Sequence, residues 1–269
     1  MPLFDAHNHL QDERFAGRQE QLIREAMAVG VAGMVVNGSS EDDWNDVAHL
    51  AERFPIVLPS YGLHPWYHHH RSSKWLERLE NLLKENPRAA VGEIGLDRWK
   101  EELPYDDQED VFLAQWELAR RLHRPASVHC LKAWGRLLEL VQTHPGPDRG
   151  FLLHSYGGPA EMIAAFAQHG AFFSFPGYYL HPRKEKQLQV FRHVPIDRLL
   201  VETDAPDQRL PDEQNIFPLL DPHGHPINHP ANLATVYQGL AALRGEDIET
   251  LTGHMGDNFI RLFVGQPPC

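Results

Sequence analysis

Residues 3–10 read LFDAHNHL and form the first apolar run of the chain. Because side chains alternate across a β-strand, His7 and His9 point to one side of such a strand and Asn8 to the other. Asp5 lies on the same side as the two histidines, one layer deeper. Two imidazoles on adjacent layers can both reach one metal ion at about 2.0–2.1 Å. The alternative stays open at this point, because a lone inward histidine is often a hydrogen-bonded core residue.

Seven further runs of this kind follow, separated by longer segments of helical period. This alternation is typical of repeated βα units and a parallel sheet. The predicted strands are residues 3–9, 31–38, 56–62, 89–95, 126–130, 151–155, 171–175 and 199–204. Eight strands with following helices in about 250 residues predict an α/β fold, a single (β/α)8 TIM barrel. No linker-like stretch interrupts the series, so residues 1–269 are expected to form one domain.

Two helices, one loop and one extra element are predicted between and after the strands. Residues 105–122 carry an apolar stripe and begin with acids, and residues 159–169 end before a glycine. Residues 207–230 are rich in Pro, Asp, Asn and His and are predicted to form a long loop after the eighth strand. Such loops lie at the catalytic face of a barrel. Residues 247–263 are predicted to form an extra C-terminal helix that packs outside the barrel or across one end.

Composition excludes several classes of protein. A net charge of −12 argues against a general electrostatic grip on nucleic acid or an anionic membrane, so no stable binding of duplex DNA is expected. No segment approaches the roughly 18 consecutive apolar residues of a membrane span, and the N-terminus does not resemble a signal peptide. Only Cys130 and Cys269 occur, so no disulfide framework is predicted and a cytoplasmic location is expected.

Polar groups follow the apolar runs of most predicted strands. Since the carboxyl ends of all barrel strands meet at one mouth, these groups are expected to converge there. Four histidines and two carboxylates come from five different strands: His7, His9, Glu93, His129, His154 and Asp204. Buried imidazoles and carboxylates at this density are tolerable mainly when they bind metal.

The two carboxylates have specific possible roles. Glu93 lies in a Gly-Glu-Ile-Gly stretch, where its two oxygens could bridge metal ions about 3.5–4 Å apart. Alternatively, Glu93 could cap the following helix. Asp204 could act as a metal ligand and general base, or it could belong to an ordinary turn at the end of a strand.

Six ordered motifs resemble the signatures of the TatD-type metal-dependent hydrolases, within the amidohydrolase superfamily. They are FDAHNHL (4–10), GLHP (62–65), GEIGLD (92–97), HSY (154–156), ETDAP (202–206) and NFIRLF (258–263). They span nearly the whole chain, and six motifs in order are far more specific than one His-x-His pair. The resemblance implies a (β/α)8 barrel with two divalent metal ions that hydrolyses ester bonds, usually phosphodiesters in DNA, as a deoxyribonuclease does.

The resemblance also implies roles for single residues. His7, His9 and Asp204 would bind the first ion, His129 and His154 the second, and Glu93 would bridge the two. Asp204 would also accept a proton from the attacking water, so Asp204 and Glu93 are the predicted catalytic residues. His64 would contact substrate or leaving group. Nitrogen and oxygen ligands together admit Zn, Mn or Mg, with Zn or Mn favoured.

The sequence departs from the family pattern where substrate would bind. The loop after the eighth strand lacks the basic residues typical of the family and keeps only an Asn-x-Pro element at Asn228. Arg98, Lys132 and Asn228 are the remaining predicted substrate contacts besides His64, and Lys100 lies near them. Since lysine and arginine contacts hold a nucleic-acid backbone, long DNA should bind poorly. Single-stranded DNA ends or a smaller phosphoester are therefore the expected substrates.

Two alternative functions remain open. The same ions could hydrolyse a small carboxylic ester, lactone or amide, or the barrel could serve only as a binding scaffold. The residues around the mouth have alternatives too: Trp66, Tyr67, Trp99 and Tyr156 could stack on a ring or simply pack. The run His68 to His70 is predicted to be a solvated loop, and Cys130 is not expected to act as a nucleophile.

Overall fold

The computed structural model describes residues 1–100 and 102–265, in which eight parallel strands follow one another around a barrel. Cys269 lies outside the described residues. The strands are β1 (Leu3–Asn8), β2 (Val31–Asn37), β3 (Val57–Tyr61), β4 (Ala90–Asp97), β5 (Ala126–Leu131), β6 (Phe151–Leu153), β7 (Ala171–Pro176) and β8 (Leu199–Glu202). Every predicted run overlaps one of these strands, although β4, β5 and β7 extend one or two residues beyond the predicted ends. Backbone bonds from Asp204 N to His7 O (2.9 Å) and from His9 N to Ala205 O (2.7 Å) join β8 back to β1.

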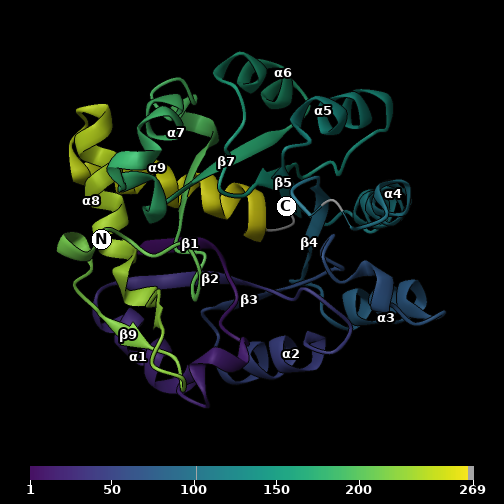
Figure 1. Cartoon of the computed structure of the whole chain (residues 1–269), viewed down its shortest axis with the longest axis horizontal. Coiled ribbons are helices and arrows are strands. Elements are labelled where there is room, and N and C mark those ends of the chain that lie inside the picture. Colours follow the sequence, from purple (N-terminus) through teal and green to yellow (C-terminus); the bar gives the residue numbers. More distant parts are fainter. Residues whose placement is uncertain (101, 266–269) are drawn as a thin grey trace.

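Helices surround the strands, as Figure 1 shows. They are α1 (Gln19–Ala28), α2 (Trp44–Arg53), α3 (Trp75–Glu85), α4 (Tyr105–Arg121), α5 (Trp134–Thr143), α6 (Ile163–Gln168), α7 (Glu185–Val190), α8 (Leu233–Arg244) and α9 (Ile248–Phe259). The first eight each follow one strand, so the prediction of a (β/α)8 barrel is confirmed. The helix predicted at residues 159–169 is shorter than expected, because a 3-10 turn at Ala160–Met162 precedes α6.

The far end of the barrel is filled by apolar side chains and closed by α9. Phe259 of α9 stacks on Phe4 of β1, with ring centroids 4.7 Å apart. The buried cluster there takes one residue from most strands: Ala6, Val35, Leu58, Ala90, Leu152, Phe172 and Leu200. The predicted extra C-terminal helix is therefore confirmed. Since apolar side chains and α9 close this end of the barrel, the polar residues at the carboxyl ends of the strands lie at the opposite mouth.

The long segment after β8 is a loop with some structure of its own. A short hairpin pairs β9 (Leu219–Leu220) with β10 (Pro226–Ile227), and Arg18 Nη2 donates to Leu220 O at 2.7 Å. The loop prediction did not include this hairpin. In the described part of the chain, no helix combines the length and apolar character needed to cross a membrane.

Candidate metal centre

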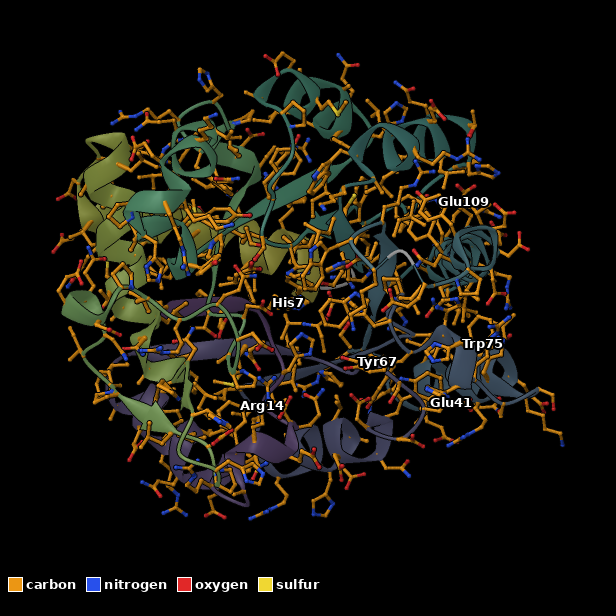
Figure 2. All side chains as sticks on the ribbon, in the orientation of Figure 1. His7, Arg14, Glu41, Tyr67, Trp75 and Glu109 are labelled. Carbon is orange, nitrogen blue, oxygen red and sulfur yellow. The ribbon has the colours of Figure 1, made fainter. Side chains whose placement is uncertain are left out.

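His7 and His9 lie at the mouth of the barrel with their Nε2 atoms 3.2 Å apart. Figure 2 shows His7 near the centre of the molecule. The other ring nitrogen of each histidine is engaged: His9 Nδ1 lies 2.8 Å from Asn37 O, and His7 Nδ1 lies 2.9 Å from Ser127 Oγ. Because a carbonyl only accepts, His9 must carry its proton on Nδ1 in the neutral form. Its Nε2 lone pair therefore faces the mouth, as a metal ligand requires.

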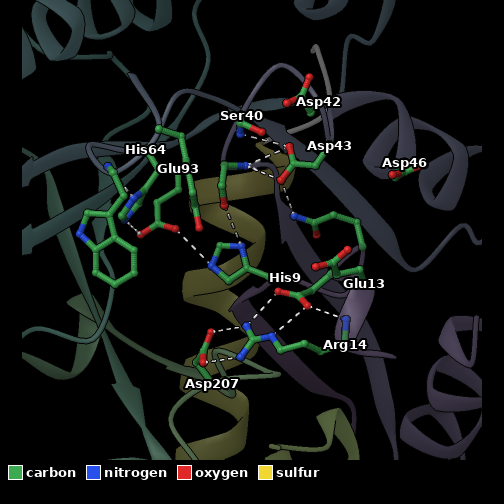
Figure 3. A pocket seen from close by; sticks show the side chains of 15 residues that line it. His9, Glu13, Arg14, Ser40, Asp42, Asp43, Asp46, His64, Glu93 and Asp207 are labelled. Atoms are coloured by element: carbon green, nitrogen blue, oxygen red, sulfur yellow. Dashed lines mark hydrogen bonds and ion pairs between the residues drawn. The ribbon is translucent and has the colours of Figure 1, made fainter. Parts of the chain in front are cut away.

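Glu93 of β4 lies between the histidines of β1 and those of β5 and β6. Its Oε2 is 3.2 Å from His9 Nε2 and 3.5 Å from His7 Nε2. Its Oε1 is 2.8 Å from His154 Nε2 and 3.2 Å from His129 Nδ1. Figure 3 shows the same carboxylate between His64 and His9. Each oxygen thus faces a different pair of imidazoles.

Asp97 supports His129 from behind. His129 Nε2 donates to Asp97 Oδ2 at 3.0 Å, and Trp66 Nε1 donates to the same oxygen at 2.7 Å. The carboxylate therefore fixes the ring and leaves His129 Nδ1 facing Glu93. From the sequence, Asp97 was noted only as the last residue of the GEIGLD motif and was given no role. Asp97 lies four residues after Glu93 on β4, and this spacing is a signal that could have revealed its role.

Asp204 lies two residues after β8 and adopts the left-handed backbone region, with φ of 50°. Its Oδ1 lies 3.5 Å from His9 Nε2 and 3.6 Å from His7 Nε2. Its Oδ2 accepts a hydrogen bond from Gln208 Nε2 at 2.6 Å. A non-glycine residue with positive φ is uncommon and occurs often at functional sites. Gln208 was not among the predicted site residues, because only the folded loop brings it to Asp204.

Burial and neighbouring charges shift the pKa values of Glu93, Asp204 and His7. Burial opposes the charge on Glu93, but His64, His154 and His7 together hold its pKa well below the usual value. Burial raises the pKa of Asp204 to about 7. Burial likewise lowers the pKa of His7 to about 4, which keeps this imidazole neutral and able to bind metal.

The donor set fits divalent metal ions. Ligand-type atoms lie within 4.8 Å of one another in three groups: His7, His9 and Asp204; His7, His154 and Glu202; and His64, Glu93 and His129. Asp204 Oδ1 is buried and has no hydrogen-bond partner among the described residues, although it faces two imidazole nitrogens. A buried acceptor of this kind is costly unless a cation or water satisfies it. Neutral nitrogen and anionic oxygen ligands suit Zn and Mn.

His64 lies beside Glu93, with Nε2 3.5 Å from Oε1. The backbone N–H of Trp66 donates to His64 Nδ1 at 3.1 Å, so the neutral ring carries its proton on Nε2. Burial holds the pKa of His64 well below its usual value. The ring therefore presents an N–H donor toward the site, which suits contact with substrate better than metal ligation.

The other predicted substrate contacts lie in different settings. Arg98 and Lys132 are exposed, and the Arg98 guanidinium lies 3.7 Å from the ring centroid of Tyr105. Asn228 is buried, and its amide donates to Thr203 O at 2.8 Å. Its carbonyl oxygen accepts from Asn232 Nδ2 at 3.2 Å. Asn228 thus stabilises the loop after β8 and is not exposed at the mouth of the barrel.

Several neighbouring residues support the site without facing it. Asp5 accepts hydrogen bonds from the backbone N–H and the hydroxyl of Thr203, so it ties β1 to β8. Glu202 accepts from Ser155 and Ser174 behind His154.

The solvated-loop prediction was wrong for His68, which is buried with Nδ1 2.7 Å from Pro65 O. Burial raises the pKa of the Cys130 thiol, consistent with an inert side chain.

A parallel (β/α)8 barrel with imidazoles and carboxylates gathered at one mouth is the arrangement of metal-dependent hydrolases. The family model described as TatD related DNase matches residues 4–264, and the chain belongs to this family.

Relatives and solved structures agree with this assignment. The chain is 30% identical over 261 residues to "Uncharacterized metal-dependent hydrolase YjjV" of Escherichia coli K12, covering 96% of each chain. It is 29% identical over 266 residues to "3'-5' ssDNA/RNA exonuclease TatD" of Citrobacter koseri, covering 97% of this chain and 98% of the relative. The crystal structure of YJJV from Escherichia coli K12 superposes with a TM-score of 0.89 at 29% identity, covering 98% of each chain.

Proposed function

We propose that the protein is a two-metal phosphodiesterase that removes nucleotides from single-stranded nucleic-acid ends. One observation carries the proposal: each oxygen of Glu93 faces a separate pair of imidazoles, at distances of 2.8–3.5 Å. This arrangement suits a carboxylate that bridges two ions. The name of the Citrobacter koseri relative supports the choice of substrate.

The residues that would hold the ions divide into two sets. His7, His9 and Asp204 would hold the first ion, and His129 and His154 the second. When bound, divalent ions activate water near neutral pH and offset the negative charge that develops on the scissile group.

The remaining chemistry belongs to the chain itself. Gln208 fixes Oδ2 of Asp204, which leaves Oδ1 directed at the site to accept a proton from the attacking water. The Nε2–H of His64 is placed to donate to the substrate or to the leaving oxygen. Arg98 and Lys132, both exposed, remain the candidate contacts for a phosphate at the rim.

A second candidate function is hydrolysis of a small carboxylic ester, lactone or amide at the same centre. It is favoured by the segment 221–230 of the long loop after β8, which holds histidines and an aspartate but no lysine or arginine. A loop segment without positive charge gives little hold on a polyanionic chain.

A substrate panel separates the two candidates. Protein reconstituted with Mn or Zn is tested on single-stranded DNA, duplex DNA, bis(4-nitrophenyl) phosphate, 4-nitrophenyl acetate and an aryl lactone. We expect hydrolysis of single-stranded DNA and of the phosphodiester, and little action on the duplex. Activity confined to the carboxylic substrates would overturn the proposal, and so would failure of the reconstituted protein to bind any divalent ion. The variant Asp204→Asn controls for a contaminating nuclease.

A further inference from the structure

The cleft next to the metal centre has an unusual distribution of charge for an enzyme that acts on phosphate esters. Its volume is about 350 Å³, and Glu93, His9 and His64 form its inner wall. Six more acids line it: Asp12, Glu13, Asp42, Asp43, Asp46 and Asp207. Arg14 is the single lysine or arginine among the lining residues. A cleft of this size takes a small group rather than an oligonucleotide.

Arg14 does not reverse this charge, because two carboxylates already engage it. Its Nη1 and Nη2 donate to both oxygens of Asp207 at 2.8 and 2.7 Å, and its Nε and Nη2 donate to Asp12 at 2.9 and 2.8 Å. Figure 3 shows the Arg14 guanidinium directed at Asp207. The three side chains together carry a net negative charge. Arg14 therefore joins the segments after β1 and β8 instead of offering a free site for phosphate.

Three of the acids are free of internal partners. Glu13, Asp42 and Asp46 are exposed, and none of them has an ion-pair partner within residues 1–100 and 102–265. Asp43 differs, since it accepts from the backbone N–H groups of Ser39 and Ser40 and so shapes the loop. In Figure 3, Asp42 and Asp46 lie with Asp43 on the right of the view, whereas Glu93 and His64 lie on the left. This wall attracts positive charge and repels phosphate.

Gln11 supplies an independent sign of a ligand. Its side chain lines the cleft and is only 9% exposed. Its Nε2 donates to Asn37 O at 2.7 Å and to Asp43 Oδ2 at 3.1 Å, and these two acceptors fix the orientation of the amide. The Oε1 is then left without a hydrogen-bond partner among the described residues. A buried acceptor in this position calls for an N–H or O–H donor.

Aromatic residues complete the cleft. Tyr67 is 43% exposed and lines it together with Trp66. Lys100 Nζ lies 3.9 Å from the Trp66 ring centroid, so one face of this ring already binds an ammonium group. Aromatic faces, free carboxylates and an unpartnered amide oxygen are the features that recognise a primary ammonium group.

We propose that this cleft is a subsite for an amine-bearing group attached to the phosphoester that the metal centre cleaves. The group enters between Tyr67 and the wall of Glu13, Asp42 and Asp46, while the phosphate lies at Glu93. A small phosphodiester with a primary ammonium group two carbons from its ester oxygen matches the charge of both regions. The inference rests on the phosphodiesterase chemistry of the proposed function and adds a small, amine-bearing phosphodiester to its substrates.

A pair of isosteric substrates tests the subsite. The metal-loaded protein is assayed with 2-aminoethyl 4-nitrophenyl phosphate and with propyl 4-nitrophenyl phosphate, after subtraction of the rate without enzyme. We expect kcat/KM to be about tenfold higher for the aminoethyl ester at low salt. The reason is that the carboxylates of Asp42 and Asp46 and an aromatic face attract an ammonium group but not a methyl group. In Asp42→Asn/Asp46→Asn the ratio should fall to below about three. The matched control Glu249→Gln/Asp257→Asn removes the same charge from α9, and its ratio should stay at the original value.

A binding measurement keeps the subsite and the proposed function separate. Calorimetry on the metal-loaded protein compares 2-aminoethyl phosphate with propyl phosphate, which requires no turnover. If neither ester is hydrolysed but the aminoethyl compound binds about tenfold more tightly, the proposed function fails and the subsite stands. Equal binding of the two phosphates, or a preference that survives in Asp42→Asn/Asp46→Asn, would overturn the subsite.

Discussion

At the scale of the residue, the site is organised by what holds the far side of each ligand. Asn37 O fixes His9, and Asp97 fixes His129, each through a hydrogen bond to the ring nitrogen away from the centre. Supports of this kind orient the imidazole and raise its basicity. Glu93 is the exception, because it faces imidazoles of both proposed ligand sets, besides His64, so its loss should disturb both halves of the centre together.

The variant Glu93→Gln should therefore bind less than half of the metal that the unchanged protein binds after the same reconstitution. An amide cannot supply the second anionic oxygen that two ions share. His64→Asn is the matched control, because the His64 ring presents a protonated Nε2 to the site. Metal analysis after desalting measures both. A greater loss of metal in His64→Asn than in Glu93→Gln would contradict the bridging role.

Metal affinity should rise with pH, because the metal-free site holds protons that an ion must displace. Burial disfavours the charged form of His9, but Glu93 and Asp204 outweigh it and raise its pKa to about 9. The pKa of Asp204 is about 7. Burial also opposes the charged forms of His129 and His154, but Asp97 and Glu93 raise the pKa of His129, and Glu93 and Glu202 raise that of His154. Below pH 7 at least His9 and Asp204 must lose a proton on binding, so log K should rise by about 2 or more per pH unit there and less steeply at higher pH. Competition with a coloured chelator measures K, and a flat profile would contradict these pKa shifts.

At the scale of the element, β4 shows how closely two strands approach behind the site. Gly95 has φ of 149°, and a Cβ at this position would collide with the carbonyl of His129 on β5. Gly95 pairs with His129 in the register of these strands. The glycine thus lets the strand that carries Glu93 lie against the strand that carries His129.

Gly95→Ala should destabilise the protein by roughly 1–3 kcal/mol or more, because a clash with backbone cannot be relieved by a rotamer change. Gly135→Ala is the matched control, since Gly135 lies in α5 without a positive φ, and a methyl group added there would meet no atom within 4 Å. Alanine there should raise stability by up to about 1 kcal/mol. Thermal unfolding of the metal-free proteins gives both values. Similar melting temperatures for the two variants would show that β4 and β5 can separate without cost.

The elements also show what could be predicted from the sequence. Eight strands, the extra helix and the family were predictable, because each rests on local periodicity or on ordered motifs. The support of His129 by Asp97 was missed, since it depends on the side-chain geometry across two neighbouring strands. The hairpin at β9 and β10 and the burial of His68 were missed for a similar reason: polar, proline-rich or histidine-rich segments carry no periodicity that reports tertiary packing.

At the scale of the whole molecule, the net charge of −12 and the acidic cleft act together. A protein that binds nucleic acid through its backbone needs several lysine or arginine contacts, and each contact steepens the dependence of affinity on salt. Exposed Arg98 and Lys132 provide positive charge near the mouth, but the cleft beside it is lined by acids. We therefore expect the molecule to hold one or two phosphates at the centre and not to follow a long chain.

Binding of a 20-base-pair duplex to the metal-loaded protein should accordingly be weaker than about 10 μM at 0.15 M salt. For single-stranded oligonucleotides the slope of log K against log salt should be no steeper than about −1.5, which corresponds to two phosphate contacts. Fluorescence anisotropy with Asp204→Asn, which should not turn the substrate over, measures both quantities. Cleavage efficiency should also stop rising once the oligonucleotide exceeds a few residues. A submicromolar duplex affinity with a steep salt slope would mean that an extended basic track exists outside the cleft, and the restriction to short or terminal substrates would then be wrong.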